Sequence, residues 1–181
     1  MTIARIAVIG AGTMGSGIAQ VCAQAGCQVD LVDVSAPSLE RARTSIARSL
    51  AKFVEKQRLS QADAAATQAR LSYAITLDAA GGADYIIEAI VEDLAAKRAL
   101  FARLDALARP DVILASNTSS ISITTLGAAT ARPDRVLGMH FMNPVPLMTL
   151  VELIAGQRTS PAAMDVALTL CQRLGKQGVQ A

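Results

Sequence analysis

The sequence predicts an α/β protein built on a mostly parallel, doubly wound β-sheet. Three observations support this fold class. Short apolar runs alternate with longer segments in which apolar residues recur every three or four positions. The first apolar run leads directly into a glycine-rich turn, GAGTMG, which is followed by a helical pattern. Hydrophobic residues make up 52% of the 181-residue chain but aromatic residues only 3%, which suits a sheet covered by closely packed helices.

The N-terminal part of the chain is expected to form two strands and a helical hairpin. We predict strands at residues 3–9 and 28–32, joined by a helix over residues 14–25. A long amphipathic helix should begin at Pro37, because proline is favoured at the first helical position. A shorter helix over residues 60–69 folds back against it, so the pair forms an insertion after the second strand. The apolar face of the long helix contains Leu39, Ala42, Ile46, Leu50 and Phe53.

The remainder of the chain continues the alternation of strands and helices. Strands are expected at residues 84–89, 112–116, 136–140 and 150–154. Helices should cover residues 93–108 and 161–174, with a short helical turn before the third of these strands. The chain ends in GKQGVQA, where a further strand would be starting. We therefore expect this sequence to be cut from a longer protein.

The turn after the first strand matches the G-x-G-x-x-G pattern of Rossmann-type dinucleotide-binding domains. Gly10 permits the tight turn, and Gly12 lets the backbone approach a pyrophosphate. Gly15 allows the helix to pack closely on the strand. Thr13 and Met14 begin this helix, whose N-terminus offers unpaired N–H groups and a positive dipole end to phosphates. These residues are therefore the predicted core of a cofactor site.

Asp33 closes the second predicted strand. Its carboxylate should accept hydrogen bonds from the ribose hydroxyls of the cofactor's adenosine. A carboxylate at this point would repel a 2′-phosphate, and no arginine follows immediately, so NAD is favoured over NADP. The alternative is an ordinary glycine turn in which Asp33 caps the next helix.

His140 is the only histidine in the chain and closes a predicted strand. It should lie at the carboxyl edge of the sheet, where ligands bind in open α/β folds. Glu152 lies on the next apolar segment, and a carboxylate bound to one imidazole nitrogen would stabilise the imidazolium formed during proton transfer. From spacing alone, a purely structural role for His140 remains open.

The segment SNTSS, residues 116–120, follows another predicted strand. It places hydroxyls and an amide at the same edge of the sheet as His140. Such residues also cap helices and form turns, and a helical stretch follows here. Both interpretations stay open at this point.

Composition excludes several classes of function. The formal net charge is only +2 and no basic run accompanies the few aromatic residues, so no nucleic-acid partner is expected. Cys22, Cys27 and Cys171 lack metal-ligand spacing, so we expect reduced thiols in a cytoplasmic protein and no metal site. No apolar stretch reaches the length of a membrane span, so no membrane partner is expected either.

Three longer segments carry a family resemblance: IIEAIVEDLAAKRALFARLD, ASNTSSISIT and GMHFMNPVPLMTLVELI. Together with GAGTMGSGIA they resemble the NAD-binding domain of the 3-hydroxyacyl-CoA dehydrogenases, in sequence and in mutual spacing. The likeness covers the chain nearly end to end and is nearest to bacterial 3-hydroxybutyryl-CoA and phenylacetate-pathway members. It implies NAD-dependent oxidation of an L-3-hydroxyacyl-CoA to a 3-ketoacyl-CoA in fatty acid β-oxidation.

The resemblance implies roles for residues at the carboxyl edge of the sheet. His140 matches the general base of the family and Glu152 the carboxylate paired with it. Ser119 matches a serine that approaches the substrate oxygen and the nicotinamide, and Asn143 an asparagine near both. Asn117, from the same SNTSS segment, is expected to contact the cofactor.

Further residues match positions that line the nicotinamide ribose or touch coenzyme A. Glu92 and Lys97 match family residues that line the nicotinamide ribose. Lys97 could instead be a solvated lysine paired with Asp93. Ser49 and Lys56 match positions that contact coenzyme A. Lys56 also belongs to a row of cations on the helix face opposite the apolar residues, and this row could bind phosphates or be an ordinary solvated face. The other members are Arg41, Arg48 and Lys52.

Family members continue through a Pro-Gly-Phe segment and an Asn-Arg pair into a helical domain that this chain lacks. That domain forms the homodimer and one wall of the substrate pocket. We therefore expect residues 1–181 to be the NAD-binding domain, able to bind cofactor with little turnover. Two alternatives remain: a β-hydroxyacid dehydrogenase acting on a free acid, and a non-catalytic NAD-binding module with a structural or sensing role.

Overall fold

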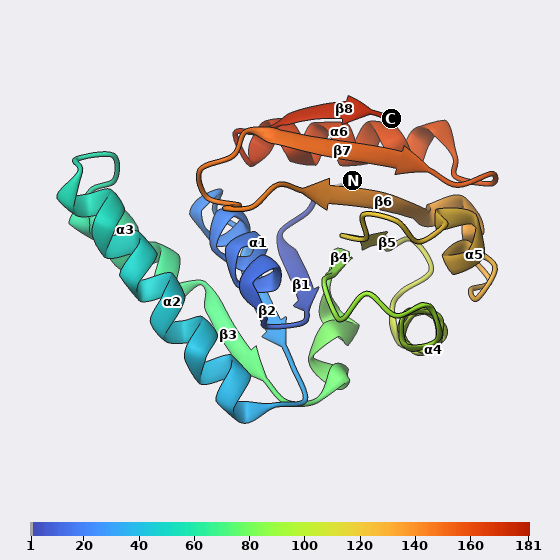
Figure 1. The fold of residues 1–181 in the computed structure, drawn as a ribbon, viewed down its shortest axis with the longest axis horizontal. Helices are drawn as coiled ribbons and strands as arrows, with labels where there is room; N and C mark the ends of the chain where they lie inside the picture. The colour runs from blue at the N-terminus through green and yellow to red at the C-terminus, as the bar shows by residue number, and fades with distance from the viewer. Residues whose placement is uncertain (1) are drawn as a thin grey trace.

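The computed structural model describes residues 2–181 and confirms the predicted fold class (Figure 1). Within this part of the chain, eight strands form one sheet in the order β3-β2-β1-β4-β5-β6-β7-β8. Strands β1 to β6 are parallel, whereas β7 runs antiparallel to β6 and β8 runs parallel to β7. The strands are β1 (Arg5–Ile9), β2 (Gln28–Val32), β3 (Leu71–Ala74), β4 (Tyr85–Glu88), β5 (Ile113–Ser116), β6 (Val136–Phe141), β7 (Leu150–Ala155) and β8 (Gln177–Gln180).

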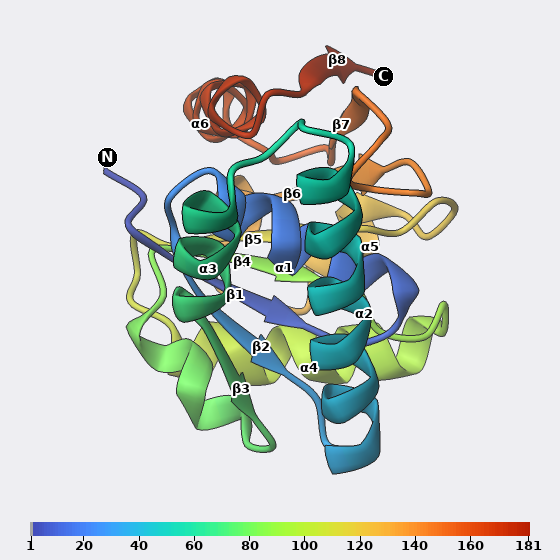
Figure 2. The same ribbon diagram turned by 90° about the vertical axis from the view of Figure 1, so that its left-hand side faces the viewer.

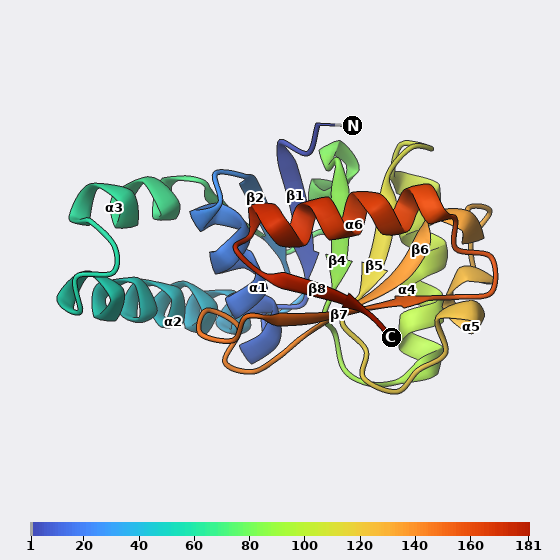
Figure 3. The same cartoon turned by 90° about the horizontal axis from the view of Figure 1, so that it is seen from above.

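Helices cover both faces of the sheet (Figures 1 and 2). The α-helices are α1 (Thr13–Gln24), α2 (Ala36–Glu55), α3 (Gln61–Ala69), α4 (Leu94–Leu107), α5 (Ile123–Gly127) and α6 (Pro161–Arg173). Residues of α1, α2, α3 and α6 share one buried apolar cluster, and residues of α4 and α5 share the other. Seen from above, α6 lies alongside β7 and β8 (Figure 3). None of the helices in residues 2–181 is long and apolar enough to cross a membrane.

Strand β1 shows why its apolar run is continuous rather than alternating. Ile6 and Val8 point into the cluster beneath α1, whereas Ala7 and Ile9 point into the cluster beneath α4. All four side chains are buried, as expected for a parallel strand that has helices on both faces. The interior strand therefore needs an apolar residue at every position.

The predicted helical hairpin after β2 is formed by α2 and α3, and its far end stands away from the sheet (Figure 1). Ser35 caps α2 by accepting a hydrogen bond from the N–H of Ser38 at 3.2 Å. The expected apolar stripe is buried except at its end, where Phe53 is only partly covered. Phe53 lies at the end of this face, where α2 extends past the sheet, and its ring borders a groove.

Strand β3 and the 3₁₀ turn η1 (Leu77–Gly82) that follows it are short elements that were not predicted. Strand β3 lies at the edge of the sheet and pairs only with β2. Its sequence, LSYA, buries just Leu71, so it has no apolar run to mark it. The strand expected to start in GKQGVQA is present as β8, and a second 3₁₀ turn, η2 (Pro133–Arg135), precedes β6.

Asp84 fixes the starts of β1 and β4. Its Oδ2 accepts hydrogen bonds from the N–H groups of Ala4 and Arg5, both at 2.9 Å, and its Oδ1 accepts one from Arg109 at 2.7 Å. Burial opposes ionisation, but the backbone hydrogen bonds and the Arg109 guanidinium outweigh it, so the pKa of Asp84 lies below its usual value. The ionised carboxylate therefore stabilises the folded state.

Replacing Asp84 with asparagine should lower the free energy of unfolding at about pH 7 by roughly 1–3 kcal/mol. Because the folded state depresses the pKa, this contribution is present above the unfolded pKa and is lost as pH falls through the folded pKa. Urea unfolding of both proteins should therefore show a stability difference that shrinks towards about pH 3. Asp111→Asn, at an exposed carboxylate 3.6 Å from Arg109, is the matched control and should change little. A difference that stays constant over this range would contradict the assignment.

Candidate functional site

The functional residues gather at one edge of the sheet, formed by the carboxyl ends of β1, β2, β4, β5 and β6. From β1 the chain builds the sheet outwards through β2 and β3, then returns to add β4 on the other side of β1. A parallel sheet opens a crevice at the carboxyl ends of the two strands where the order reverses. Strands β1 and β4 are those strands here. The expected dinucleotide site therefore lies above the turn that follows β1.

The glycine-rich turn fits this crevice because two of its glycines have no room for a side chain. Gly10 has a φ of 108°, and a Cβ on it would collide with the carbonyl of Ala89 at the end of β4. A Cβ on Gly15 would collide with the carbonyl oxygen of Gly10. Gly12 begins α1 without any side-chain cap, and no atom lies within 4 Å of the Cβ position it lacks. The N-terminus of α1 therefore has free space beside Gly12, as the close approach of a pyrophosphate requires.

Asp33 connects the glycine turn to the end of β2. Its Oδ2 accepts the N–H of Ala11 at 2.9 Å, and its Oδ1 accepts the N–H of Ser35 at 2.8 Å. The alternative in which Asp33 caps the next helix is wrong, because Ser35 is the N-cap of α2. The half-buried carboxylate keeps further lone pairs on both oxygens, so it can still accept ribose hydroxyls.

Lys97 belongs to a buried ion network at the ends of β4 and β5. Its Nζ donates to Glu88 Oε2 at 2.5 Å and lies 3.6 Å from Glu92 Oε2. The side chains of Lys97 and Glu88 are only 1% and 0% exposed. The alternative of a solvated Lys97 paired with Asp93 is wrong, because Asp93 caps α4 by accepting the N–H of Ala96 at 2.8 Å. Burial of the ammonium requires the carboxylate partner that Glu88 provides.

Glu92 is the member of this network that reaches the open edge of the sheet, with 41% of its side chain exposed. Its Oε1 accepts hydrogen bonds from the hydroxyls of Thr118 and Ser120. Burial opposes its ionisation, but these hydrogen bonds and the Lys97 charge outweigh it and hold the pKa of Glu92 below its usual value. Glu92 is therefore an ionised acceptor that is held in place beside the turn after β5.

Glu88 was not singled out by sequence reasoning. It accepts hydrogen bonds from the hydroxyl of Ser116 at 2.6 Å and the N–H of Ile90 at 2.8 Å, in addition to the bond from Lys97. Each of these partners donates to it, which is the pattern of an ionised carboxylate. The signal that could have found it is a glutamate in the otherwise apolar strand YIIE, which needs a cationic partner when buried.

The SNTSS segment divides into supporting and exposed residues. Ser116 and Thr118 are buried and bind the two glutamates, and the Oδ1 of Asn117 accepts the N–H of Phe141 at 2.8 Å. Ser119 is exposed at the turn. The residue that caps α5 is Ser122, which lies outside the segment. Capping therefore does not account for Ser119, and its hydroxyl is accessible at the open edge.

His140 and Glu152 form a cross-strand pair. They face one another in the register of β6 and β7, and His140 Nδ1 lies 2.9 Å from Glu152 Oε2. Their side chains are 22% and 40% exposed, so the pair is reachable from solvent. In the tautomer that carries hydrogen on Nδ1, this atom donates to Glu152 and Nε2 is left with a lone pair that can take a proton. The structure thus brings together the two residues that the sequence analysis paired.

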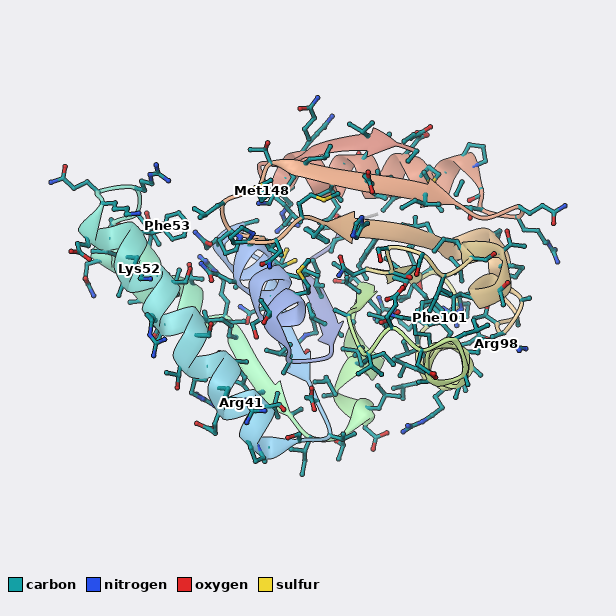
Figure 4. The ribbon with its side chains drawn as sticks, viewed as in Figure 1. Arg41, Lys52, Phe53, Arg98, Phe101 and Met148 are labelled. Atoms are coloured by element: carbon teal, nitrogen blue, oxygen red, sulfur yellow. The ribbon has the colours of Figure 1, made fainter. Side chains whose placement is uncertain are left out.

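Asn143 follows β6 and borders a groove of about 370 Å³ between α1, α2 and residues 143–147. Figure 4 labels Lys52 and Phe53 on the α2 side and Met148 at the end of the facing loop. Ser49 and Lys56, the two residues expected to touch coenzyme A, both line the groove. The charged residues that line it are all cations, namely Arg48, Lys52, Lys56 and Arg58.

Only part of the predicted row of cations on α2 lies along the groove. Arg48, Lys52 and Lys56 border the groove, whereas Arg41 lies nearer the start of α2 and donates to Ser38 Oγ at 2.9 Å. Ser49 is held on the groove side because its hydroxyl accepts a hydrogen bond from Gln20 at 3.0 Å. The groove thus offers a positive lining and a hydroxyl to an elongated anionic ligand.

Fold and site define an NAD-binding domain of a dehydrogenase. Residues 5–181 match the family described as 3-hydroxyacyl-CoA dehydrogenase, NAD binding domain, and the chain belongs to this family. It is 46% identical to a probable 3-hydroxybutyryl-CoA dehydrogenase of Bacillus subtilis, over 99% of this chain and 63% of that protein. It is 42% identical to the 3-hydroxyadipyl-CoA dehydrogenase of Escherichia coli, over 99% of this chain and 38% of that protein.

A solved structure shows the same architecture. The crystal structure of (S)-3-hydroxybutyryl-CoA dehydrogenase PaaH1 from Ralstonia eutropha matches with a TM-score of 0.96 and 42% identity, over 99% of this chain and 63% of that one. The predicted family, the Rossmann-type fold and NAD as the cofactor are therefore confirmed. The chain spans somewhat less than two thirds of the length of the Bacillus and Ralstonia proteins.

The buried network predicts a specific pattern of stability. Lys97→Met should lower the free energy of unfolding by about 3–5 kcal/mol, because it leaves the buried Glu88 carboxylate without its cation. Adding Glu88→Gln should recover at least half of this loss, because the double variant removes both charges. Urea unfolding measures both effects.

Arg98→Met is the matched control, since Arg98 is the exposed neighbour on the outer side of α4 (Figure 4). The free energy of unfolding of this control variant should differ from that of the unaltered chain by no more than about 0.5 kcal/mol. If the double variant were no more stable than Lys97→Met, the uncompensated charge of Glu88 would not be the cause.

Proposed function

We propose that this chain is the cofactor-binding and proton-transferring part of an NAD-dependent L-3-hydroxyacyl-CoA dehydrogenase. The observation that carries the proposal is the His140–Glu152 pair, which lies at the same edge of the sheet as the glycine turn. The cationic groove that begins at Asn143 adds a place for a coenzyme A thioester beside this edge. Family membership supports the reaction class.

The residues present fit NAD in three places. The open N-terminus of α1 at Gly12 would hold the pyrophosphate, and Asp33 the adenosine ribose. Glu92, supported by Lys97, would accept the hydroxyls of the nicotinamide ribose. NAD held by these residues would supply a hydride acceptor.

The chain's own residues would carry the proton chemistry. His140 Nε2 would take the proton of the substrate's 3-hydroxyl, and the nicotinamide, when bound, would supply the acceptor for the hydride from C3, so that the products would be a 3-ketoacyl-CoA and NADH. Glu152 stabilises the imidazolium that forms, through its contact with Nδ1. The hydroxyl of Ser119 would orient the developing carbonyl oxygen, and Asn143, which borders the groove, would lie beside the reacting group.

The groove favours a coenzyme A thioester over the free acid of the alternative β-hydroxyacid dehydrogenase. Its four cations match phosphate groups, which a free 3-hydroxy acid does not have. Ser49 and Lys56 are the proposed coenzyme A contacts, with Ser119 at the acyl end. The alternative of a non-catalytic NAD-binding module is disfavoured because the His140–Glu152 contact is intact.

We further propose that residues 1–181 form the NAD-binding domain of a longer cytoplasmic enzyme. In this proposal a helical domain completes the substrate pocket and forms a homodimer. The three free, buried thiols suit a reducing compartment. The substrate end of the crevice is open to solvent at Ser119 and Asn143 and would be closed by that domain.

Cofactor choice is tested by calorimetric titration of this chain with NAD⁺ and NADP⁺. NAD⁺ should bind at least roughly tenfold more tightly, because Asp33 repels a 2′-phosphate. Asp33→Asn, which keeps an oxygen acceptor but loses the charge, should reduce the difference between the NAD⁺ and NADP⁺ affinities. Asp63→Asn, at an exposed carboxylate of α3, is the control and should leave both affinities unchanged. Equal affinities in the unaltered chain would refute the role of Asp33.

The catalytic assignment is tested in a full-length dehydrogenase that contains this chain. His140→Gln should reduce turnover of 3-hydroxybutyryl-CoA by about 10² to 10⁴ and leave NAD⁺ affinity unchanged. Free 3-hydroxybutyrate should be a far poorer substrate than the thioester. Near-normal turnover of His140→Gln would remove this residue from the mechanism, and equal use of the free acid would favour the β-hydroxyacid alternative.

A further inference from the structure

Lys176 is a buried cation at the start of β8 that none of the steps above uses. Only 9% of the residue is exposed. Its Nζ donates to the carbonyl oxygens of Val145 at 2.5 Å and Met148 at 2.6 Å. It takes part in none of the ion pairs formed within residues 2–181. Burial lowers the pKa of its ammonium below the usual value, so placing the charge here has a free-energy cost that the two carbonyls must offset.

The two carbonyls belong to a compact turn between β6 and β7. The N–H groups of Leu147 and Met148 both donate to the carbonyl of Pro144, at 3.1 and 3.0 Å. The turn therefore uses its N–H groups internally and leaves the carbonyls of Val145 and Met148 in need of donors. Lys176 supplies both hydrogen bonds from one atom, and the neighbouring Gln177 N–H donates to Thr149 at 2.7 Å. These three hydrogen bonds thus connect the loop to the start of β8.

The same loop forms one wall of the cationic groove. Residues 143–147 line it opposite Ser49, Lys52 and Phe53 of α2. Val145 also packs directly on α1, because a Cβ on Gly17 would lie 2.8 Å from the Cβ of Val145. The distance between the two walls of the groove therefore depends on where this loop is held.

We propose that Lys176 is a positioning residue for acyl-CoA binding. Its ammonium holds residues 143–148 so that the groove stays open at its observed width and Asn143 stays at the end nearest His140. Lys176 does not line the groove and acts only through the loop carbonyls. The inference rests on the proposed function in one respect, namely that the ligand of the groove is a coenzyme A thioester.

The test compares ligand binding by this chain and by Lys176→Met, which keeps the length of the side chain but removes its donors. Calorimetry with coenzyme A itself should show affinity reduced roughly tenfold or more, because the loop wall is no longer fixed. NAD⁺ affinity should fall by a smaller factor than coenzyme A affinity, because Gly12 and Asp33 do not contact the loop and only Asn143 connects it to the cofactor site. A merely structural lysine would leave coenzyme A affinity unchanged in the folded variant. Gln177→Met, at the exposed neighbour, is the matched control and should bind both ligands normally.

Hydrogen exchange of the loop separates this inference from the proposed function. In Lys176→Met the amides of Leu147 and Met148 should exchange at least tenfold faster, while those of β1 keep their protection. If exchange becomes faster in this way but the unaltered chain does not bind coenzyme A, the hold of Lys176 on the loop is supported and coenzyme A is refuted as the ligand. Should Lys176→Met fail to fold, Lys176→Gln provides the same comparison, because its shorter side chain cannot reach both carbonyls. A folded variant with unchanged exchange and unchanged coenzyme A affinity would overturn the proposal.

Discussion

The close contact between the glycine turn and the end of β4 organises the functional edge of this domain. Gly10 bends the chain at positive φ against the carbonyl of Ala89, and Gly15 lets α1 start directly over that bend. With no side chain between them, the N-terminus of α1 sits at the reversal point of the sheet. Asp33 then binds the N–H of Ala11 and fixes the same turn from the β2 side. The position of the phosphate site follows from these contacts.

Two buried cations stabilise the loops that frame this edge. Lys97 is neutralised by Glu88 and holds Glu92 beside the turn after β5. Lys176 has only carbonyl partners and holds the loop after β6. In both cases the free energy lost by burying charge is offset by short hydrogen bonds from the ammonium to buried acceptors. Both cations thus support polar residues that remain exposed to a ligand.

The reversal of β7 has a direct chemical consequence. Because β7 runs antiparallel to β6, its first residues lie at the edge where β6 ends, and Glu152 pairs with His140. A parallel β7 would place Glu152 nearer the amino ends of the strands and away from His140. Residues 143–147 of the turn that makes the reversal also border the cationic groove. The His140–Glu152 pair and the wall of the groove therefore depend on the same short connection.

Local sequence patterns determined the order of strands and helices, the glycine turn, Asp33 and the pairing of His140 with Glu152. The first three are recorded in adjacent residues or in a spacing that the parallel sheet converts directly into position, whereas the pairing also requires that β7 runs antiparallel to β6. Only the tertiary structure decided the partners of Lys97 and Lys176, the exposure of Phe53 and the presence of β3. Those depend on contacts between segments far apart in the chain, such as Lys176 with Val145, whose free energy no local pattern records.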